Sequence, residues 1–352
     1  MPSLFDPIQV GDLHLPNRIF MAPLTRLRGT PDHIPTPIMI DYYTQRASAG
    51  LIISEGIPID PFGVGYANVP GLWSQQQVEA WKPITKAVHD KGGHIFAQIW
   101  HVGRISDPEL LNGQQSIAPS AIAATGYVSL LRPQRSYPVP RALETHEIKG
   151  IVEAFRRGAQ NAQSAGFDGV ELHGANGYLL DQFLQDGSNH RTDEYGGPIE
   201  NRARLMLEAA EAAISVFGPG RVGLHLAPRG DAHGIFDSNP AATFSYIANE
   251  LGKRKLAFIA AREHIGPDSI GPNLKKLFGG VLVANEAIDQ HTGQQLLDED
   301  KADAVAFFGK LFIANPDLPF RFAKQASLNR PEPNTFYAPG PHGYTDYPSL
   351  QA

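Results

Sequence analysis

Eight apolar, β-branched segments recur along the chain, and most of them end in glycine, proline or a polar residue. Near-continuous apolar strands of this kind belong to a parallel sheet that is covered on both faces. The segments are Ile19–Thr25, Gly50–Glu55, His94–His101, Gly169–His173, Arg221–Ala227, Leu256–Ala261, Gly280–Ala284 and Ala304–Phe308. Eight strands that alternate with helical patterns predict a (β/α)8 TIM barrel, because a right-handed crossover leads each strand to the next.

The helical patterns between these strands are each followed by glycine, a residue that commonly ends a helix. The clearest are Gln76–Lys91, Glu147–Ala165 and Glu200–Phe217. We expect one domain for the whole chain, residues 1–352, because barrels with loop insertions reach this length.

Two segments are additional to the barrel. Residues 3–17 precede the first strand and contain a Gly11-Asp12 turn, so we expect a hairpin that closes the bottom of the barrel. Residues 102–141 follow the third strand, are rich in Pro, Gly and Ser, and lack a helical period. A long irregular excursion after a strand is usually functional. We expect it to cap the catalytic mouth.

Composition excludes several classes of function. The chain has no cysteine, so disulfides, thiolate nucleophiles and cysteine-ligated iron–sulfur clusters are impossible within it. Its net charge of −6 gives no reason to expect nucleic acid or an anionic membrane as a partner. No apolar stretch is long enough to span a bilayer and the first residues do not resemble a signal peptide, so we expect a cytoplasmic protein. Thirteen histidines occur without a carboxylate cluster, and we expect no metal site.

Polar residues stand at the ends of the predicted strands, where the active sites of TIM barrels lie. Thr25, Gln98 and His173 end the first, third and fourth strands, and Asn176 follows closely. Buried polar groups need hydrogen-bond partners. The carbonyl and nitrogen edge of a flavin ring lying across the barrel mouth would supply them.

Long motifs around these residues resemble the old yellow enzyme family of FMN-dependent NAD(P)H ene-reductases. The most specific is HGANGYLLDQFL at 173–184, which is followed by NHRTDEYGG at 189–197. ANPDLP at 314–319 is an independent match, and further similar segments run from Leu4 to Pro348. Without cysteines or an extra C-terminal domain, the chain resembles the single-domain branch that has no iron–sulfur cluster.

The resemblance implies a non-covalent FMN at the barrel mouth. It places the Thr25 hydroxyl near O4 of the ring, the backbone of Gly56 at the ring edge, and Gln98 on the pyrimidine portion. The full set of cofactor-binding residues that it implies is Pro23, Thr25, Gly56, Gln98, His225, Ala284, Asn285, Gly309, Lys310 and Phe336.

The resemblance also implies the reaction, in which hydride passes from NADPH or NADH through the flavin to the β-carbon of an unsaturated carbonyl, maleimide or nitroalkene. His173 and Asn176 would hold the substrate oxygen and stabilise its developing charge, as in an oxyanion hole. Tyr178 would supply a proton to the α-carbon. Tyr66, Trp100 and Tyr337 would shape the substrate pocket, although Tyr66 and Trp100 are also explained by packing at the barrel rim.

Three positions depart from the family pattern, and all concern the flavin. His225 stands where the family has Arg, and an ordinary histidine titrates near pH 6.5 rather than being permanently charged. Arg229 or Arg262 could supply the cation instead. Asn285 replaces Gly, and Asn tolerates left-handed backbone better than most residues. Lys310 replaces Arg in Phe308-Gly309-Lys310 and can still bind phosphate.

These departures leave alternatives open. One is a barrel that binds flavin or another phosphate-bearing ligand and has weak or no reductase activity. Another is an aldolase or isomerase, for which Lys310 is the candidate Schiff-base residue. The sequence does not decide between a monomer and a homodimer. It does not decide between NADPH and NADH either, although the family resemblance favours NADPH.

Overall fold

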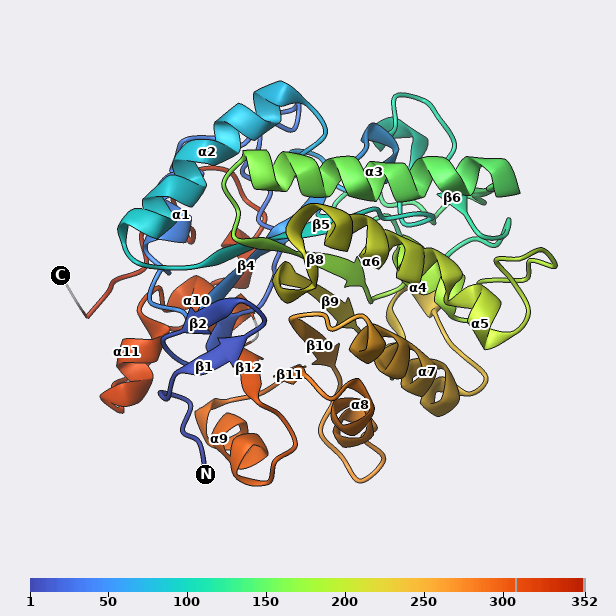
Figure 1. Cartoon of the computed structure of the whole chain (residues 1–352). Coiled ribbons are helices and arrows are strands. Elements are labelled where there is room, and N and C mark those ends of the chain that lie inside the picture. The colour runs from blue at the N-terminus through green and yellow to red at the C-terminus, as the bar shows by residue number, and fades with distance from the viewer. Residues whose placement is uncertain (308, 351–352) are drawn as a thin grey trace.

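Eight parallel strands close into a barrel in a computed structural model that describes residues 1–307 and 309–350. Around the barrel the strands follow one another in chain order, from β3 to β12 and back to β3 (Figure 1). They are β3 (Ile19–Met21), β4 (Leu51–Pro58), β5 (Ile95–Trp100), β8 (Gly169–Gly174), β9 (Val222–Leu226), β10 (Phe258–Arg262), β11 (Val281–Asn285) and β12 (Ala304–Phe307). The predicted TIM barrel is confirmed.

Each predicted strand overlaps one of these, but the first is shorter than expected. It ends at Met21, so Thr25 lies in the loop that follows. Pro23 explains the early end, because it has no N–H to donate to the neighbouring strand. Phe308, at the end of the eighth predicted strand, lies outside the described residues.

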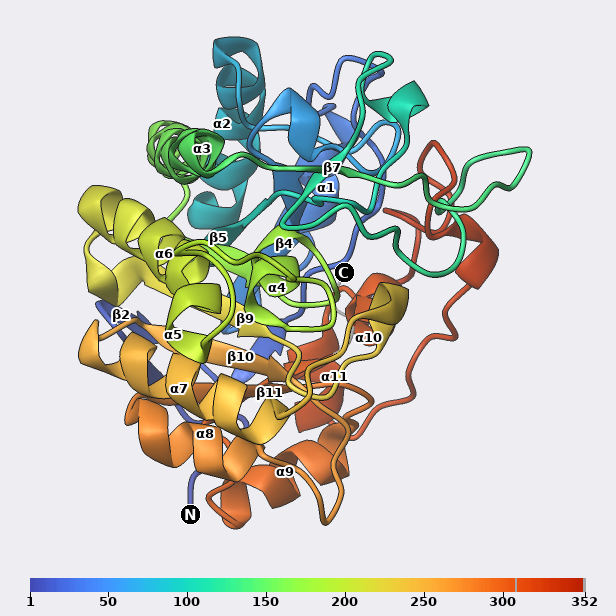
Figure 2. The same ribbon diagram turned by 90° about the vertical axis from the view of Figure 1, so that its right-hand side faces the viewer.

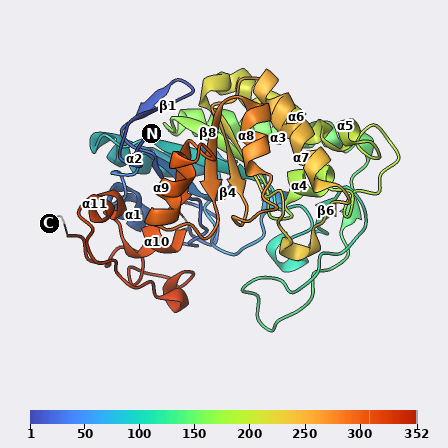
Figure 3. The same cartoon turned by 90° about the horizontal axis from the view of Figure 1, so that it is seen from below.

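Helices surround the barrel (Figure 3). They are α1 (Ile38–Thr44), α2 (Gln75–Asp90), α3 (Thr145–Ser164), α4 (Leu179–Leu184), α5 (Ile199–Arg202), α6 (Arg204–Phe217), α7 (Pro240–Lys253), α8 (Gly271–Phe278), α9 (Gln290–Asp298), α10 (Gly309–Ala314) and α11 (Leu318–Ala323). The predicted helix Glu200–Phe217 is in fact two helices, α5 and α6, separated at Ala203. No helix in the described part of the chain has the length and apolar character needed to cross a bilayer.

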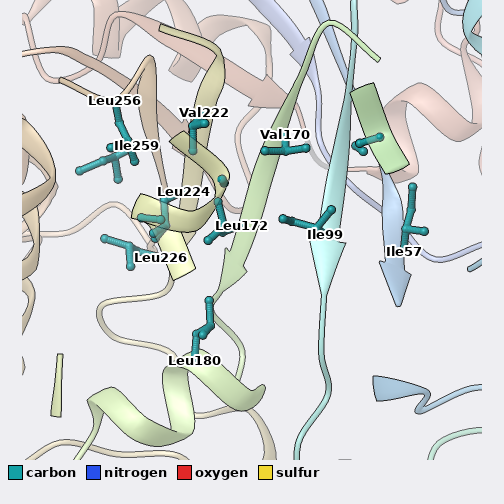
Figure 4. Packing of buried hydrophobic residues seen from close by; sticks show 14 of the residues in the cluster. Ile57, Ile99, Val170, Leu172, Leu180, Val222, Leu224, Leu226, Leu256 and Ile259 are labelled. Atoms are coloured by element: carbon teal, nitrogen blue, oxygen red, sulfur yellow. The ribbon is translucent and has the colours of Figure 1, made fainter. Parts of the chain in front are cut away.

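Alternate side chains of the strands pack on opposite faces of the barrel wall. Those that face the helices include Val170, Leu172 and Leu224 (Figure 4). Inside the barrel, the rings of Phe96 and Phe258 lie 5.9 Å apart. Because side chains fill this interior, a ligand is confined to the open end of the barrel.

The N-terminal hairpin is present as predicted. Strand β1 (Ile8–Val10) pairs with the antiparallel β2 (Leu13–Leu15), and Gly11 in the turn has φ 53°, a conformation that glycine adopts readily. The apolar side chains of both strands join the cluster that fills the barrel interior. The hairpin therefore closes one end of the barrel.

Residues 102–141 are mostly irregular and project from one side of the barrel (Figure 2). A short strand within them, β6 (Ile117–Ala118), pairs with β7 (Arg141–Ala142). The excursion packs through Val128 and Tyr137 into the same cluster as Trp100 and Tyr178. The excursion thus packs against the aromatic residues at the barrel mouth.

Candidate active site

A cavity of about 590 Å³, its open mouth included, lies at the C-terminal ends of the barrel strands. It is lined by Pro23, Leu24, Thr25, Gly56, Tyr66, Gln98, Trp100, His173, Asn176, Tyr178, His225 and Tyr337. The cavity thus brings together eleven residues that were predicted from the sequence, and Leu24 is the addition. No residue of the 102–141 excursion lines it.

The other five predicted cofactor residues lie outside this cavity. Ala284 and Asn285 line a neighbouring pocket beside β10 and α8. Gly309 and Lys310 begin α10, which follows β12. Phe336 packs in a small apolar cluster with Ile313, Ala314, Tyr347 and Leu24. All five belong to the part of the barrel that contains β11 and β12 or to the C-terminal segment beside it.

The turn after β11 differs from the prediction. Asn285 is the last residue of the strand, and its Nδ2 donates to the carbonyl of Ala306 over 2.7 Å. The residues with positive φ are the next two, Glu286 at 103° and Ala287 at 51°. The expectation of a left-handed backbone at Asn285 is therefore wrong. Two non-glycine residues hold this conformation instead, and such strain is commonly found at functional sites.

His173 is poised as a neutral hydrogen-bond donor. Its Nδ1 accepts from the backbone N–H of Ala175 over 3.4 Å. Burial, with the nearby His225 and Arg262, lowers the pKa of His173 well below the usual value. A neutral imidazole that accepts at Nδ1 must carry its proton on Nε2. The chemistry of the ring therefore supplies a donor to the cavity.

His225 is also neutral. Burial and the charge of Arg262 lower its pKa to about 3. Titration near pH 6.5, which was expected from the sequence, is therefore wrong for this structure. Of the two arginines considered as replacements, Arg262 is the one beside the site. Arg229 is instead paired with Glu263 and Asp268.

Below these histidines lies a buried acid that the sequence analysis missed. Glu171 of β8 accepts a 2.7 Å hydrogen bond from Nε2 of Gln98, which also lies 3.4 Å from Nδ1 of His225. Burial raises the pKa of Glu171 to about 8. Its signal in the sequence was an acid within an otherwise apolar strand, GVELHG.

Tyr178 stands among other aromatic rings. Its hydroxyl lies 3.2 Å from the hydroxyl of Tyr66, and its ring is edge-on to Trp100 with centroids 4.8 Å apart. Burial raises the pKa of Tyr178 well above its usual value, so the phenol stays protonated at neutral pH. A protonated hydroxyl with a second hydroxyl beside it can donate a proton and be resupplied.

Gly56 has a steric role that the sequence did not reveal. A Cβ at this position would lie 2.7 Å from the ring of Trp100. Trp100 is buried and nearly parallel to His173, with centroids 5.9 Å apart. Glycine therefore allows the indole to pack against β4 and form one wall of the cavity.

Comparison with known proteins identifies the family. Residues 3–329 match the NADH:flavin oxidoreductase / NADH oxidase family. The chain belongs to this family. The relatives include 12-oxophytodienoate reductase 1 of Oryza sativa subsp. japonica, 44% identical over 362 residues that cover 99% of this chain and 93% of the relative. A "Probable flavin mononucleotide-dependent alkene reductase" of Leishmania infantum is 42% identical over 356 residues, covering 99% of this chain and 97% of the relative.

Solved structures agree with this assignment. The old yellow enzyme homologue from Zymomonas mobilis has a TM-score of 0.96 and 46% identity, with 99% of this chain and 100% of that chain covered. Morphinone reductase in complex with tetrahydroNAD also has a TM-score of 0.96, with 49% identity and coverage of 100% and 98%. The resemblance to old yellow enzymes is confirmed.

Among residues 1–307 and 309–350, no three His, Asp or Glu side chains are close enough to hold a metal ion together. The polar groups that line the cavity are amide, hydroxyl, imidazole and phenol groups.

We expect Glu171→Gln to remove a pH-dependent decrease in the free energy of unfolding. The pKa of Glu171 is 4.5 in the reference state and about 8 when folded, so the folded protein holds a proton that the unfolded chain has lost in this window. Stability of the wild type therefore falls as pH rises from about 4.5 to about 8, by up to roughly 1.4 kcal/mol per pH unit. The glutamine side chain mimics the protonated acid and does not titrate.

Urea unfolding of both proteins at several pH values in this window measures the difference. The advantage of the variant should grow with pH. Parallel stability curves would show that Glu171 is not linked to folding.

Proposed function

We propose that this chain is an FMN-dependent ene-reductase that uses NADPH or NADH to reduce electron-poor alkenes. The observation that carries the proposal is the cavity at the barrel mouth. It combines a neutral imidazole donor, His173, with the amide of Asn176 and the protonated phenol of Tyr178. Its partners are therefore small molecules with an oxygen acceptor beside the double bond: unsaturated carbonyls, maleimides and nitroalkenes.

The chemistry of the cavity fits a flavin ring. Such a ring has a polar pyrimidine edge, and Thr25, Gln98 and His225 offer a hydroxyl, an amide and an imidazole to it. Pro23, Leu24 and the aromatic side chains offer apolar surface for its faces. Bound FMN would supply the hydride chemistry, taking hydride from the nicotinamide and delivering it to the alkene.

We assign the phosphate end of FMN to the turns after β11 and β12. Ala284, Asn285, Gly309 and Lys310 lie there, and backbone N–H groups with a lysine suit a phosphate. Phe336 packs nearby against α10. This assignment follows the phosphate site that TIM barrels commonly place after their last two strands.

His173 and Asn176 would bind the substrate oxygen. When hydride reaches the β-carbon, negative charge develops on that oxygen, and two converging donors stabilise it. The low pKa of His173 matters here, because it fixes the imidazole as a neutral donor that need not exchange a proton with the substrate.

Tyr178 would protonate the α-carbon. Because the pKa of its phenol is raised, the tyrosinate that remains after proton transfer is unfavourable and must quickly receive another proton. The hydroxyl of Tyr66 is the group placed to provide it. Trp100 and Tyr337 would limit the shape of the substrate beside these residues.

We propose one barrel domain spanning residues 1–352, in which the 102–141 excursion caps the mouth indirectly by packing against Trp100 and Tyr178, and a monomer or homodimer in the cytoplasm. The net charge of −6 supports small-molecule rather than nucleic-acid partners. The proposed location rests on the composition of the sequence.

The purified protein tests the proposed function directly. We expect a flavin absorbance band that is bleached by NADPH or NADH without oxygen and is restored by a cyclic enone. A colourless protein with no affinity for added FMN, or a flavin that no enone or nitroalkene reoxidises, would favour the ligand-binding alternative.

A further inference from the structure

We propose that Arg262 is a positioning residue that orients the amide of Asn176 toward the substrate oxygen, and that Glu286 holds Arg262 in place for this task. The proposal rests on the function proposed above. It extends the site to residues on β10 and in the turn after β11, which do not line the cavity.

The central contact joins two residues that are far apart in sequence. Arg262, at the end of β10, donates from Nη1 to Oδ1 of Asn176 over 2.6 Å. A guanidinium has only donors, so the atom of the amide that faces it must be the oxygen. The two N–H donors of Nδ2 are thereby left for a ligand in the cavity that Asn176 lines.

This orientation decides what Asn176 can do. A carboxamide can turn about its last torsion and present either its oxygen or its nitrogen. An amide oxygen facing an anionic substrate oxygen would repel it, whereas the N–H groups would stabilise it. Arg262 removes the unfavourable orientation because the guanidinium cannot accept a hydrogen bond from Nδ2.

The backbone of Asn176 is held separately. Asn176 has a left-handed backbone with φ 58°, and its carbonyl oxygen lies 2.9 Å from Nδ1 of His233. These features fix where the side chain starts. They do not determine whether the oxygen or the nitrogen of the amide faces the cavity. The contact with Arg262 determines this.

Glu286 restrains the guanidinium from the opposite side. Its carboxylate pairs with Nε of Arg262, so one arginine bridges Glu286 and Asn176. Strands β10 and β11 are in register with Arg262 opposite Asn285, which places Glu286 at the adjoining position. Glu286 keeps this place at φ 103°, a conformation that favours glycine, and strain of this kind at a non-glycine residue points to a functional constraint.

The charge of Arg262 also reaches the neighbouring donors. It contributes to the lowered pKa of both His173 and His225. Burial is the main reason that His173 is neutral, and a cation at this point adds to that effect and favours negative charge on a bound oxygen. The orientation of Asn176 and the local field therefore act in the same direction.

A double-mutant cycle tests the proposal. The variants are Arg262→Met, Asn176→Ala and their combination, and the probe is 4-hydroxybenzaldehyde, whose phenolate oxygen mimics the anionic substrate oxygen. Its binding is followed by the change in flavin absorbance. We expect Arg262→Met to weaken binding by about tenfold, the effect of a coupling of roughly 1.4 kcal/mol. Arg262→Met should weaken binding less in the Asn176→Ala background than in the wild type, because part of its effect acts through the amide.

Two further variants separate positioning from general damage. Arg262→Lys should bind more tightly than Arg262→Met, because an ammonium group is also only a donor. Glu286→Gln should reproduce part of the Arg262→Met defect. Arg229→Met is the matched control, since Arg229 is bonded to Glu263 and Asp268 and should leave phenol binding unchanged.

Several results would overturn the proposal. One is a double variant in which the losses of phenol affinity of the two single variants multiply. Another is a shifted flavin potential in Arg262→Met with unchanged phenol binding, which would make Arg262 a direct partner of the flavin. If the wild type binds the phenol but reduces no alkene, the proposed function fails while the cycle still decides the role of Arg262. A neutron structure of Arg262→Met gives a readout that needs no flavin, because it distinguishes the amide nitrogen from the oxygen, and an Asn176 amide that still presents Nδ2 to the cavity would contradict the proposal.

Discussion

Tyr178→Phe is expected to slow the reoxidation of the reduced flavin by a cyclic enone by roughly 10²–10⁴-fold, the contribution typical of a positioned proton donor. The phenol is buried and its raised pKa keeps it protonated, so the wild type always presents the proton. Phenylalanine keeps the ring that packs edge-on to Trp100 and removes only the hydroxyl. Reduction of the flavin by the nicotinamide should be nearly unchanged, because that step does not use this proton.

Stopped-flow measurement of the two half-reactions checks this expectation. Nitroalkenes should be less affected than enones, since a nitronate is stable before it is protonated. Tyr66→Phe is the matched control: it removes the neighbouring hydroxyl at 3.2 Å and should cause a smaller loss. If the reductive half-reaction is the one that collapses in Tyr178→Phe, the proton donor is another group.

Much of the fold was predictable because its physical cause is local. A parallel barrel strand is buried on both faces, so it appears in the sequence as a short apolar run, as in Leu51–Pro58 or Ile95–Trp100. The residues after such runs must meet at one end of the barrel. For this reason Gln98, His173 and Asn176 could be assigned to one site before any contact between them was known.

The properties that could not be predicted depend on contacts between distant segments. Burial raises the pKa of Glu171, and burial together with Arg262 on another strand lowers the pKa of His225. The bond between Arg262 and Asn176 spans 86 positions. Nothing local to Glu286 indicates positive φ, because glutamate rarely adopts it. Sequence patterns thus located the site, whereas its protonation and orientation required the structure.

The double replacement of His173 and Asn176 by alanine is expected to cause the other large loss. Removal of one oxyanion donor commonly costs about 10²–10³-fold in rate, or roughly 2.7–4 kcal/mol. The two donors here act on one oxygen, so their effects should not simply multiply. Binding of FMN should survive, because the groups proposed to hold it lie on other strands and loops, including Thr25 and Gln98.

The loss should appear as weaker binding of phenols together with slower alkene reduction. Each single variant separates the two donors, and Asn176→Ala should weaken phenol binding at least as much as Arg262→Met does. His173→Gln is the conservative comparison, since it retains an N–H donor. Unchanged turnover of a cyclic enone by the double variant, with flavin bound, would contradict the assignment. Retained binding of phenols would do so independently, because phenol binding requires no hydride transfer.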